Sequence, residues 1–369
     1  MATVRGRRPP TWPAAGGFAA GLLAAALLAA AAAAAPGRDT GLALPPGFVA
    51  DVYVSGRGFD SSGERRVPGI PAMGTLGLDG TGTLYLARTG ARFRSGEVED
   101  LWPLYRIPPG GADLTAETES NFLYGPPLPN PQVGTVTRDG TVWITTYDRD
   151  RQLGALYRVV NGRPTLFAGG RPDPGAPPVL RHPEGVAVDA AGRVYVTDRE
   201  QDAVLRFTPT GALLSPPYAR MRRVRMLAFD PSGLLWLGGD GTAETPFGPG
   251  MGEIWRVGPD GAAHPALTGP LPAGMAVGPG GILFVAQRRT GQLFAVTPEG
   301  DRIEFGSARS GSFVRGLAFA PDTPETRRTG VAGDLFVIVA PRTMWLVNDV
   351  VRISGPFEAW LRDPAPPTP

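Results

Sequence analysis

The most regular pattern in this chain is a short apolar run that recurs six times. Each copy has a glycine, a variable residue, an aliphatic residue, an aromatic residue and a second aliphatic residue. The copies are GTLYLAR (82–88), GTVWITT (140–146), GRVYVTD (192–198), GLLWLGG (233–239), GILFVAQ (281–287) and GDLFVIV (333–339). A glycine before such a run is typical of a tight turn that leads into a buried strand.

Two further apolar runs accompany each copy in a constant order. The runs that precede the copies are LGLD (76–79), GTVT (134–137), VAVD (186–189), LAFD (227–230), MAVG (275–278) and LAFA (317–320). The runs that follow them are LYRI (104–107), LYRV (156–159), VLRF (204–207), IWRV (254–257), LFAV (293–296) and MWLV (344–347). A turn such as Thr297–Gly300 then leads to a fourth strand. Four strands per repeating unit match a propeller blade, whose two faces are both covered by neighbouring blades.

We therefore predict an all-β fold, a six-bladed β-propeller with four-stranded antiparallel blades, over residues 47–361. Either the strand Phe48–Val54 or the run Val351–Trp360 is expected to close the ring. Residues 36–46 are a Pro-rich linker and residues 362–369 a Pro-rich tail, and both are expected to be flexible.

Residues 1–35 carry a different pattern. Arg5, Arg7 and Arg8 precede an uninterrupted apolar run from Phe18 to Ala35. Such a segment is typical of a signal peptide, or of an N-terminal membrane anchor helix if it is not cleaved. Arg7 and Arg8 resemble a twin-arginine signal but are followed by two prolines. We expect an extracytoplasmic protein, periplasmic or secreted, that meets a membrane only through this segment.

Composition excludes several classes of function. The chain has no Cys and two His, which excludes disulfides and thiolate or His-rich metal centres. It also has no Lys. Without residues 1–35 there remain 33 Arg against 34 acidic residues, so no nucleic-acid footprint is expected.

The stretch HPEGVAVDAAGRVYVTDREQDAVLRFTPTG (182–211) closely resembles an NHL repeat, the blade of many extracytoplasmic six-bladed propellers. LPPGFVADVYVSG (44–56) resembles the opening of sugar and sorbosone dehydrogenase-type propellers, which are often linked to the quinone PQQ. Regucalcin and gluconolactonase-type lactonases share this architecture. The resemblance implies a fold and leaves the function open.

Candidate chemistry lies where the innermost strands begin, because these residues line the mouth of the central channel. Aligning the blades on Asp189 places six residues at one ring position: Gly74, Gln132, Glu184, Arg225, Ala273 and Arg315. In blades that follow one another in simple order, Glu184 neighbours Arg225 and faces Arg315. Two Arg, one Glu and one Gln suit a small anionic ligand or a protein partner. An internal salt-bridge cluster that fills the pore is the alternative.

Two enzymatic hypotheses follow from the resemblance. The sugar dehydrogenases imply a PQQ cofactor and a His base, for which His182 is the candidate, although their cofactor contacts include Lys. The lactonases imply a divalent cation, for which Glu184 is the ring residue and Asp148, Asp198 and Asp240 are further candidates. Asp198 also matches the Asp that supports a turn in NHL repeats. The first hypothesis is a ligand-binding propeller without a cofactor or metal, and whether the protein is an enzyme stays open.

Overall fold

The computed structural model describes residues 39–59, 66–68, 70–71, 73–88, 101–115, 117–148, 151–172, 174–244, 248–309, 312–341 and 347–367. The predicted signal or anchor segment, residues 1–35, lies outside these ranges. None of the helices in the described ranges is long and apolar enough to cross a membrane.

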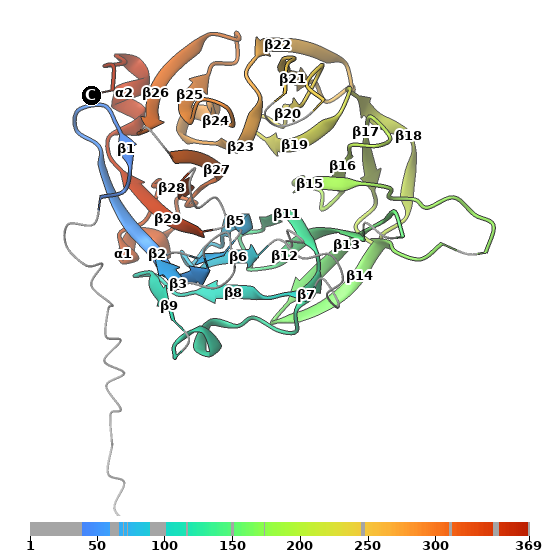
Figure 1. Ribbon diagram of the computed structural model, residues 1–369. Coiled ribbons are helices and arrows are strands. Elements are labelled where there is room, and N and C mark those ends of the chain that lie inside the picture. The colour runs from blue at the N-terminus through green and yellow to red at the C-terminus, as the bar shows by residue number, and fades with distance from the viewer. Residues whose placement is uncertain are drawn as a thin grey trace, which may run out of the picture. The chain divides into compact units, whose positions relative to one another are not determined.

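Six sheets stand in a ring around a central axis, so the predicted six-bladed β-propeller is confirmed (Figure 1). The innermost strands are β5 (Met73–Leu78), β11 (Pro131–Val136), β15 (Pro183–Val188), β19 (Val224–Phe229), β23 (Pro272–Val277) and β27 (Ser312–Phe319). Each innermost strand contacts the next one along the chain, and β27 contacts β5. The blades therefore follow one another in simple order.

Blades two to five contain the four antiparallel strands that the repeat predicts. Outside the innermost strands they consist of β12 (Val142–Asp148), β13 (Leu153–Val160) and β14 (Arg163–Gly169); β16 (Val194–Asp198), β17 (Ala203–Phe207) and β18 (Leu213–Arg220); β20 (Leu235–Gly239), β21 (Gly252–Val257) and β22 (Ala263–Gly269); and β24 (Leu283–Gln287), β25 (Gln292–Val296) and β26 (Arg302–Ala308). Blade five gains a fifth strand, β1 (Leu42–Ala43), which lies within the predicted linker.

Blade one departs from the prediction, because its described part has three strands: β5, β6 (Leu84–Arg88) and β8 (Leu104–Ile107). After β8 the chain turns through Gly110 and Gly111, both with positive φ, and β9 (Ala112–Leu114) pairs with blade six instead. A Cβ on Gly111 would lie 2.0 Å from the Tyr53 carbonyl oxygen, so only glycine allows this approach. The insertions of this blade form η1 (Glu119–Phe122) and a small sheet of β7 (Leu101–Trp102) and β10 (Leu128–Pro129).

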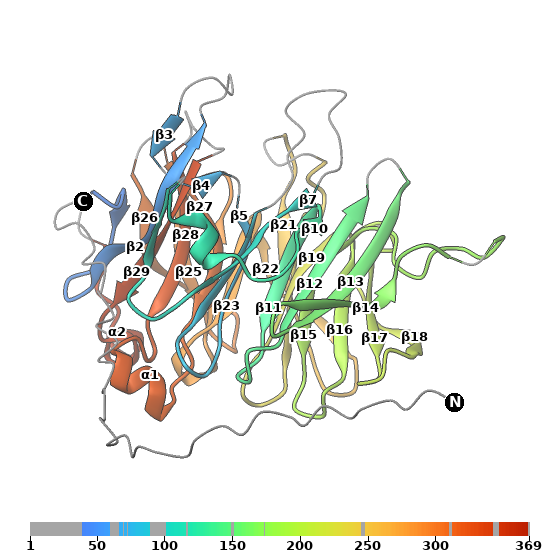
Figure 2. The same ribbon diagram turned by 90° about the horizontal axis from the view of Figure 1, so that it is seen from below.

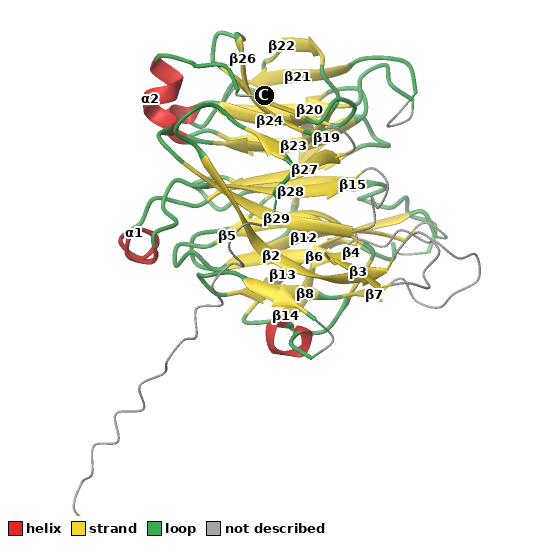
Figure 3. Cartoon of the chain, turned by 60° about the vertical axis from the view of Figure 1, so that its left-hand side comes forward, coloured by secondary structure: helices red, strands yellow, loops and turns green. Residues whose placement is uncertain are grey.

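The N-terminal strand closes the ring. Blade six consists of β27, β28 (Leu335–Pro341), β29 (Val347–Ser354) and β2 (Val49–Phe59), with β3 (Arg66–Pro68) and β4 (Ile70–Pro71) attached. The outermost strand β2 thus joins the two ends of the chain in one sheet. The other candidate, the run Val351–Trp360, forms the end of β29 and helix α2 (Phe357–Arg362). Helices α1 (Pro324–Thr329) and α2 lie at the outside of the ring (Figure 3).

The prediction that MWLV (344–347) is the third strand of blade six is wrong. Leu335 pairs with Ile353, just as Val194 pairs with Phe207 in blade three. The equivalent run is therefore VVRI (350–353), which has Arg at the place where LYRI, LYRV, VLRF and IWRV also have it. Residues 344–346 lie outside the described residues.

The repeated glycine is required by the turn between the first and second strands. All six copies, Gly82, Gly140, Gly192, Gly233, Gly281 and Gly333, have positive φ. An aspartate before the turn closes it in blades one, three and four. In blade three, Asp189 Oδ1 accepts the backbone N–H groups of Ala191 and Arg193, both at 2.9 Å. All six blades thus share the glycine before the second strand, whereas in blade six the connection is longer and contains helix α1.

An aromatic cluster holds the closing region in place. Trp360 of α2 is 5% exposed, and its ring packs edge-on against Phe305 at 4.9 Å and Phe48 at 6.3 Å between centroids. Phe357 packs against the same two rings. Helix α2 therefore fastens the start of β2 to blade five.

Trp360→Ala is expected to lower the free energy of unfolding by about 3 kcal/mol, because it removes a large buried side chain from this cluster. Guanidinium denaturation followed by circular dichroism measures the change. Leu213→Ala, at a site that is 46% exposed, is the control and should change stability little. Equal effects of the two substitutions would contradict the role of α2 in ring closure.

Candidate functional site

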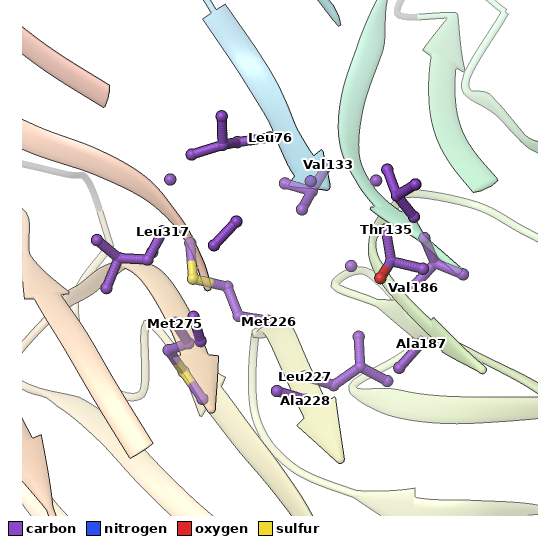
Figure 4. Close-up of a pocket in the computed structure, with 18 of the residues that line it drawn as sticks. Leu76, Val133, Thr135, Val186, Ala187, Met226, Leu227, Ala228, Met275 and Leu317 are labelled. Carbon is purple, nitrogen blue, oxygen red and sulfur yellow. The ribbon is translucent and has the colours of Figure 1, made fainter. Parts of the chain in front are cut away.

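The ring encloses a central channel with a volume of about 300 Å³. All six innermost strands line it, with side chains such as Leu76, Val133, Val186, Met226, Met275 and Leu317 (Figure 4). Thr135 is the one lining residue with a polar side chain in the described part of the chain. Each innermost strand pairs with a second strand on one side only, so its other edge faces the channel.

The ring position predicted from the sequence lies at one end of this channel. Glu184, Arg225 and Arg315 each come directly before the stretch of their strand that lines the channel, and Gly74 and Ala273 line it themselves. The innermost strands begin at this end. The short strands β3, β4 and β7 lie on the same face of the ring (Figure 2). We call this end the channel mouth.

Glu184 and Arg225 meet as the sequence alignment predicts. The Arg225 Nε donates to Glu184 Oε2 at 2.7 Å, and Glu184 is 5% exposed. Arg225 Nη1 reaches Asp240 Oδ1 at 3.4 Å, and Asp240 Oδ2 accepts from Arg199 Nη2 at 2.9 Å. Burial lowers the pKa of Arg225, but Glu184 and Asp240 outweigh burial, so the pKa is raised. Arg225 is thus a firmly charged and paired cation.

Arg315 has the opposite surroundings. Its Nη1 atom is buried and has no hydrogen-bond partner in the described part of the chain. Burial, and then repulsion by Arg225, lower the pKa of Arg315 to about 10. Arg225 belongs to blade four and Arg315 to blade six. The repulsion between them crosses blade five, whose residue at the ring position is the small Ala273. In the described residues no ion pair joins Arg315 to Glu184, so the two facing charges do not neutralise each other directly.

His182 lies beside the mouth and is held in place from two sides. Its ring stacks on Tyr147 with a centroid distance of 4.0 Å and an interplanar angle of 6°. Its Nε2 is 3.7 Å from Glu184 Oε1. Burial lowers the pKa of His182, and Glu184 opposes this shift only in part. The imidazole is therefore neutral at pH 7.

Gln132 is the ring residue that turns to its own loop. Its Nε2 donates to the backbone oxygen of Asn130 at 3.0 Å. The pairing of β11 with β12 shifts register between Pro131 and Gly134, as the pairing of β15 with β16 does between Pro183 and Val186. Gln132 therefore occupies the same ring position as Glu184.

Two buried threonines position the backbone of Glu184 and Arg225. Thr145 Oγ1 donates to the backbone oxygen of Glu184. Thr197 Oγ1 donates to the backbone oxygen of Arg225 at 2.8 Å and accepts from Gly185 N at 2.7 Å. At this position of the second strand, blades two and three have a threonine. The other four blades have residues without a hydroxyl, namely Ala87, Gly238, Ala286 and Ile338. The sequence analysis missed this signal.

The aspartates that were considered as metal ligands have other partners. Asp198 is fully buried and accepts backbone N–H groups from Arg181, His182 and Gln201. It therefore supports loops, as the resemblance to NHL repeats implies. Asp240 forms ion pairs with Arg225 and Arg199. Asp148 Oδ2 lies 3.5 Å from Arg151 Nη1. No group of three or more metal-ligating side chains occurs in the described ranges.

Comparison with known proteins agrees with this architecture. Residues 180–207 match the NHL repeat family. A gluconolactonase from Xanthomonas campestris shares 14% identity at a TM-score of 0.53, covering 85% of this chain and 91% of its own. The PQQ-bound aldose sugar dehydrogenase from Streptomyces coelicolor shares 14% identity at a TM-score of 0.54, covering 84% and 99%. Virginiamycin B lyase from Staphylococcus aureus shares 12% identity at a TM-score of 0.49, covering 83% of this chain and 99% of its own.

A search of curated proteins gives no match to this chain. At such low identities the structural likeness shows the fold alone. The chain is a six-bladed β-propeller whose third blade carries an NHL repeat, and its architecture is related to that of gluconolactonase and PQQ-dependent sugar dehydrogenase propellers.

Proposed function

We propose that this protein is an exported binding propeller that holds a small anionic ligand at the channel mouth through Arg315, with Arg225 two blades away but within electrostatic range. The observation that carries the proposal is the buried Nη1 of Arg315, which has no hydrogen-bond partner in the described part of the chain. A buried donor without an acceptor costs stability, and a carboxylate supplies charged acceptors in the geometry that a guanidinium prefers. An anion would also offset the repulsion between the two arginines.

The surroundings favour a ligand with one negative charge. Glu184 is at the same ring position and keeps its carboxylate near the mouth through its bond to Arg225. A second negative charge on the ligand would meet this carboxylate. A monocarboxylate is therefore the ligand class that fits best.

The mouth does not fit PQQ, which carries three carboxylates. Glu184 and Asp240 already neutralise Arg225, and Asp240 also pairs with Arg199. Arg315 is then the one guanidinium at the described mouth without a carboxylate partner. One face of the His182 ring is covered by Tyr147, and its Nε2 faces Glu184.

A divalent cation at Glu184 is also disfavoured. Its Oε2 accepts a charged hydrogen bond from Arg225, and a second guanidinium, that of Arg315, lies within electrostatic range of Arg225. Two arginines repel a divalent ion at this place. The described residues thus support neither a quinone-dependent nor a metal-dependent reaction.

Export is part of the proposal and rests on the pattern of residues 1–35. The protein is expected in the extracytoplasmic fraction of a bacterial host, with its N-terminus beyond the apolar run if the signal is cleaved. Cell fractionation with N-terminal sequencing tests this, and a product found only in the cytoplasm would contradict it.

Arg315→Gln is expected to abolish ligand binding while leaving the fold intact. In the wild type, sodium acetate should raise the midpoint of thermal unfolding relative to sodium chloride at equal ionic strength, and the variant should lose this difference. Without acetate the variant should be the more stable protein, by on the order of 2 °C, because it no longer buries an unpaired charge. Arg163→Gln, an exposed arginine of β14, is the matched control. An acetate effect that persists in Arg315→Gln would refute the site.

Glu184→Gln distinguishes a binding site from a structural cluster. The substitution leaves buried Arg225 without its principal partner, which should cost roughly 3 kcal/mol of stability. It also removes the negative charge from the mouth, so acetate should bind more tightly. Urea denaturation measures the stability, and calorimetric titration measures the affinity for acetate. A loss of stability with no gain in anion affinity would favour the cluster that only fills the pore.

The stability of the wild type should rise relative to Arg315→Gln as the pH increases from 9 to 12. The folded protein holds the Arg315 proton less tightly, with a pKa of about 10, than the unfolded chain, in which the pKa of arginine has its ordinary, higher value. The unfolded state therefore binds more protons in this window, and the cost of the buried charge disappears. Urea denaturation of both proteins at several pH values gives the difference. A gap that is independent of pH would show that Arg315 is not electrostatically strained.

A further inference from the structure

One of the two histidines of this chain lies at the channel mouth. Histidine is the side chain whose charge ordinarily changes between pH 5 and 8. His264 is exposed in β22, the outermost strand of blade four. His182 instead directly precedes β15, beside the ring position of blade three. The proposed anion site assigns no role to this imidazole.

The ring of His182 is fixed with one nitrogen facing a carboxylate. Stacking on Tyr147, with 4.0 Å between the ring centroids, holds the plane of the ring. Its Nε2 lies 3.7 Å from Glu184 Oε1, which is longer than a hydrogen bond. A positive charge on the imidazole would be attracted to the carboxylate at this distance. The face of Tyr147 also tolerates such a charge, because an aromatic face attracts cations.

Glu184 connects His182 to a chain of ion pairs. Its Oε1 faces His182, and its Oε2 accepts from Arg225 Nε at 2.7 Å. Arg225 also pairs with Asp240, and Asp240 pairs with Arg199. The chain contains two carboxylates and two guanidinium groups, so it is neutral as long as His182 is neutral. A proton on His182 therefore gives this part of the mouth a net positive charge.

The surroundings of His182 keep the ring neutral at pH 7 and still allow it to be protonated. Burial is the largest influence and lowers the pKa of His182, and Arg199 and Arg225 act in the same direction. Glu184 and Asp198 oppose them. The side chain of His182 is 24% exposed, so water can deliver a proton to it. The ring consequently gains its charge at acidic pH, below the ordinary pKa of histidine.

Arg225 is the electrostatic link between His182 and the anion site. It lowers the pKa of His182 and also that of Arg315. A charge at either of these two places is therefore felt at Arg225, and no direct contact between His182 and the anion is needed. An interaction of this kind is weaker than that of a contacting ion pair.

We propose that His182 is a proton-linked switch of the anion site, and that a proton on its ring strengthens the binding of an anion at Arg315. This inference rests on the proposed function and adds the regulation of that site. While His182 is neutral, Arg225 alone offsets the carboxylate of Glu184 that repels an incoming anion. Once His182 is charged, the same carboxylate lies between two cations and repels the anion less. Linkage is reciprocal, so a bound anion holds the proton on His182 more tightly.

Formate titrations at several pH values test the proposal. Formate stays ionised in mildly acidic solution because formic acid is a stronger acid than acetic acid. At constant ionic strength, calorimetry should show an affinity that rises about threefold to tenfold from pH 8 to pH 5, the effect of one added charge at moderate distance.

The two histidines provide matched variants. His182→Gln removes the group that takes up the proton, so formate should bind with the same affinity at pH 8 and pH 5. His264→Gln makes the same change at the exposed histidine and should keep the pH dependence of the wild type.

Nuclear magnetic resonance of the imidazole groups gives a readout on the unmodified protein. The two histidines give two sets of signals, which the two variants assign. Saturating formate should raise the pKa of His182 by about half a unit to one unit, which corresponds to the threefold to tenfold gain in affinity. The pKa of His264 should stay the same.

The outcomes separate this inference from the function on which it rests. Formate that binds equally at both pH values, without moving the pKa of His182, would leave the anion site standing and overturn the switch. No binding at any pH would overturn both. A pH dependence that persists in His182→Gln, or equal pKa shifts at His182 and His264, would assign the effect to another group or to salt, and would also overturn the switch.

Discussion

The structure depends on closing a ring of sheets whose two faces are both apolar. An open ring would expose the faces of its two end blades, so the first and last segments of the chain must join in one sheet. Strand β2 does this by pairing with β29, and the packing of Trp360 on Phe48 fastens the junction. Once the ring is closed, the first residues of six separate strands meet at the axis. The channel mouth is therefore a consequence of closure, and its chemistry depends on which residues occupy that position.

The repeat made most of this predictable, because each blade needs the same glycine turn and the same buried second strand. The failures have local causes. MWLV matches the apolar and aromatic pattern of the other third strands, but strand pairing selects VVRI, the run that places Arg352 beside Asp334. Blade one lacks its fourth strand because two glycines let the chain pass beside Tyr53 and join blade six.

The candidate site was predictable only as far as the ring geometry determines it. Simple blade order makes Glu184 and Arg225 neighbours, and the alignment predicted their contact. It could not predict that Asp240 and Arg199, which follow second strands, extend this pair: Asp240 contacts both Arg225 and Arg199. The hydroxyls of Thr145 and Thr197 were also missed, because in a strand sequence a buried threonine resembles any other β-branched residue.

The distribution of partners at the mouth argues against a purely structural cluster. A cluster that only fills a pore is most stable when every buried charge has a partner. Glu184, Arg225, Asp240 and Arg199 satisfy this rule, and Asp198 satisfies it through backbone N–H groups. Arg315 departs from it, with a buried donor and a like charge as its electrostatic neighbour. Glutamine or leucine at position 315 would fill the same space at lower cost, and this supports the proposed anion site.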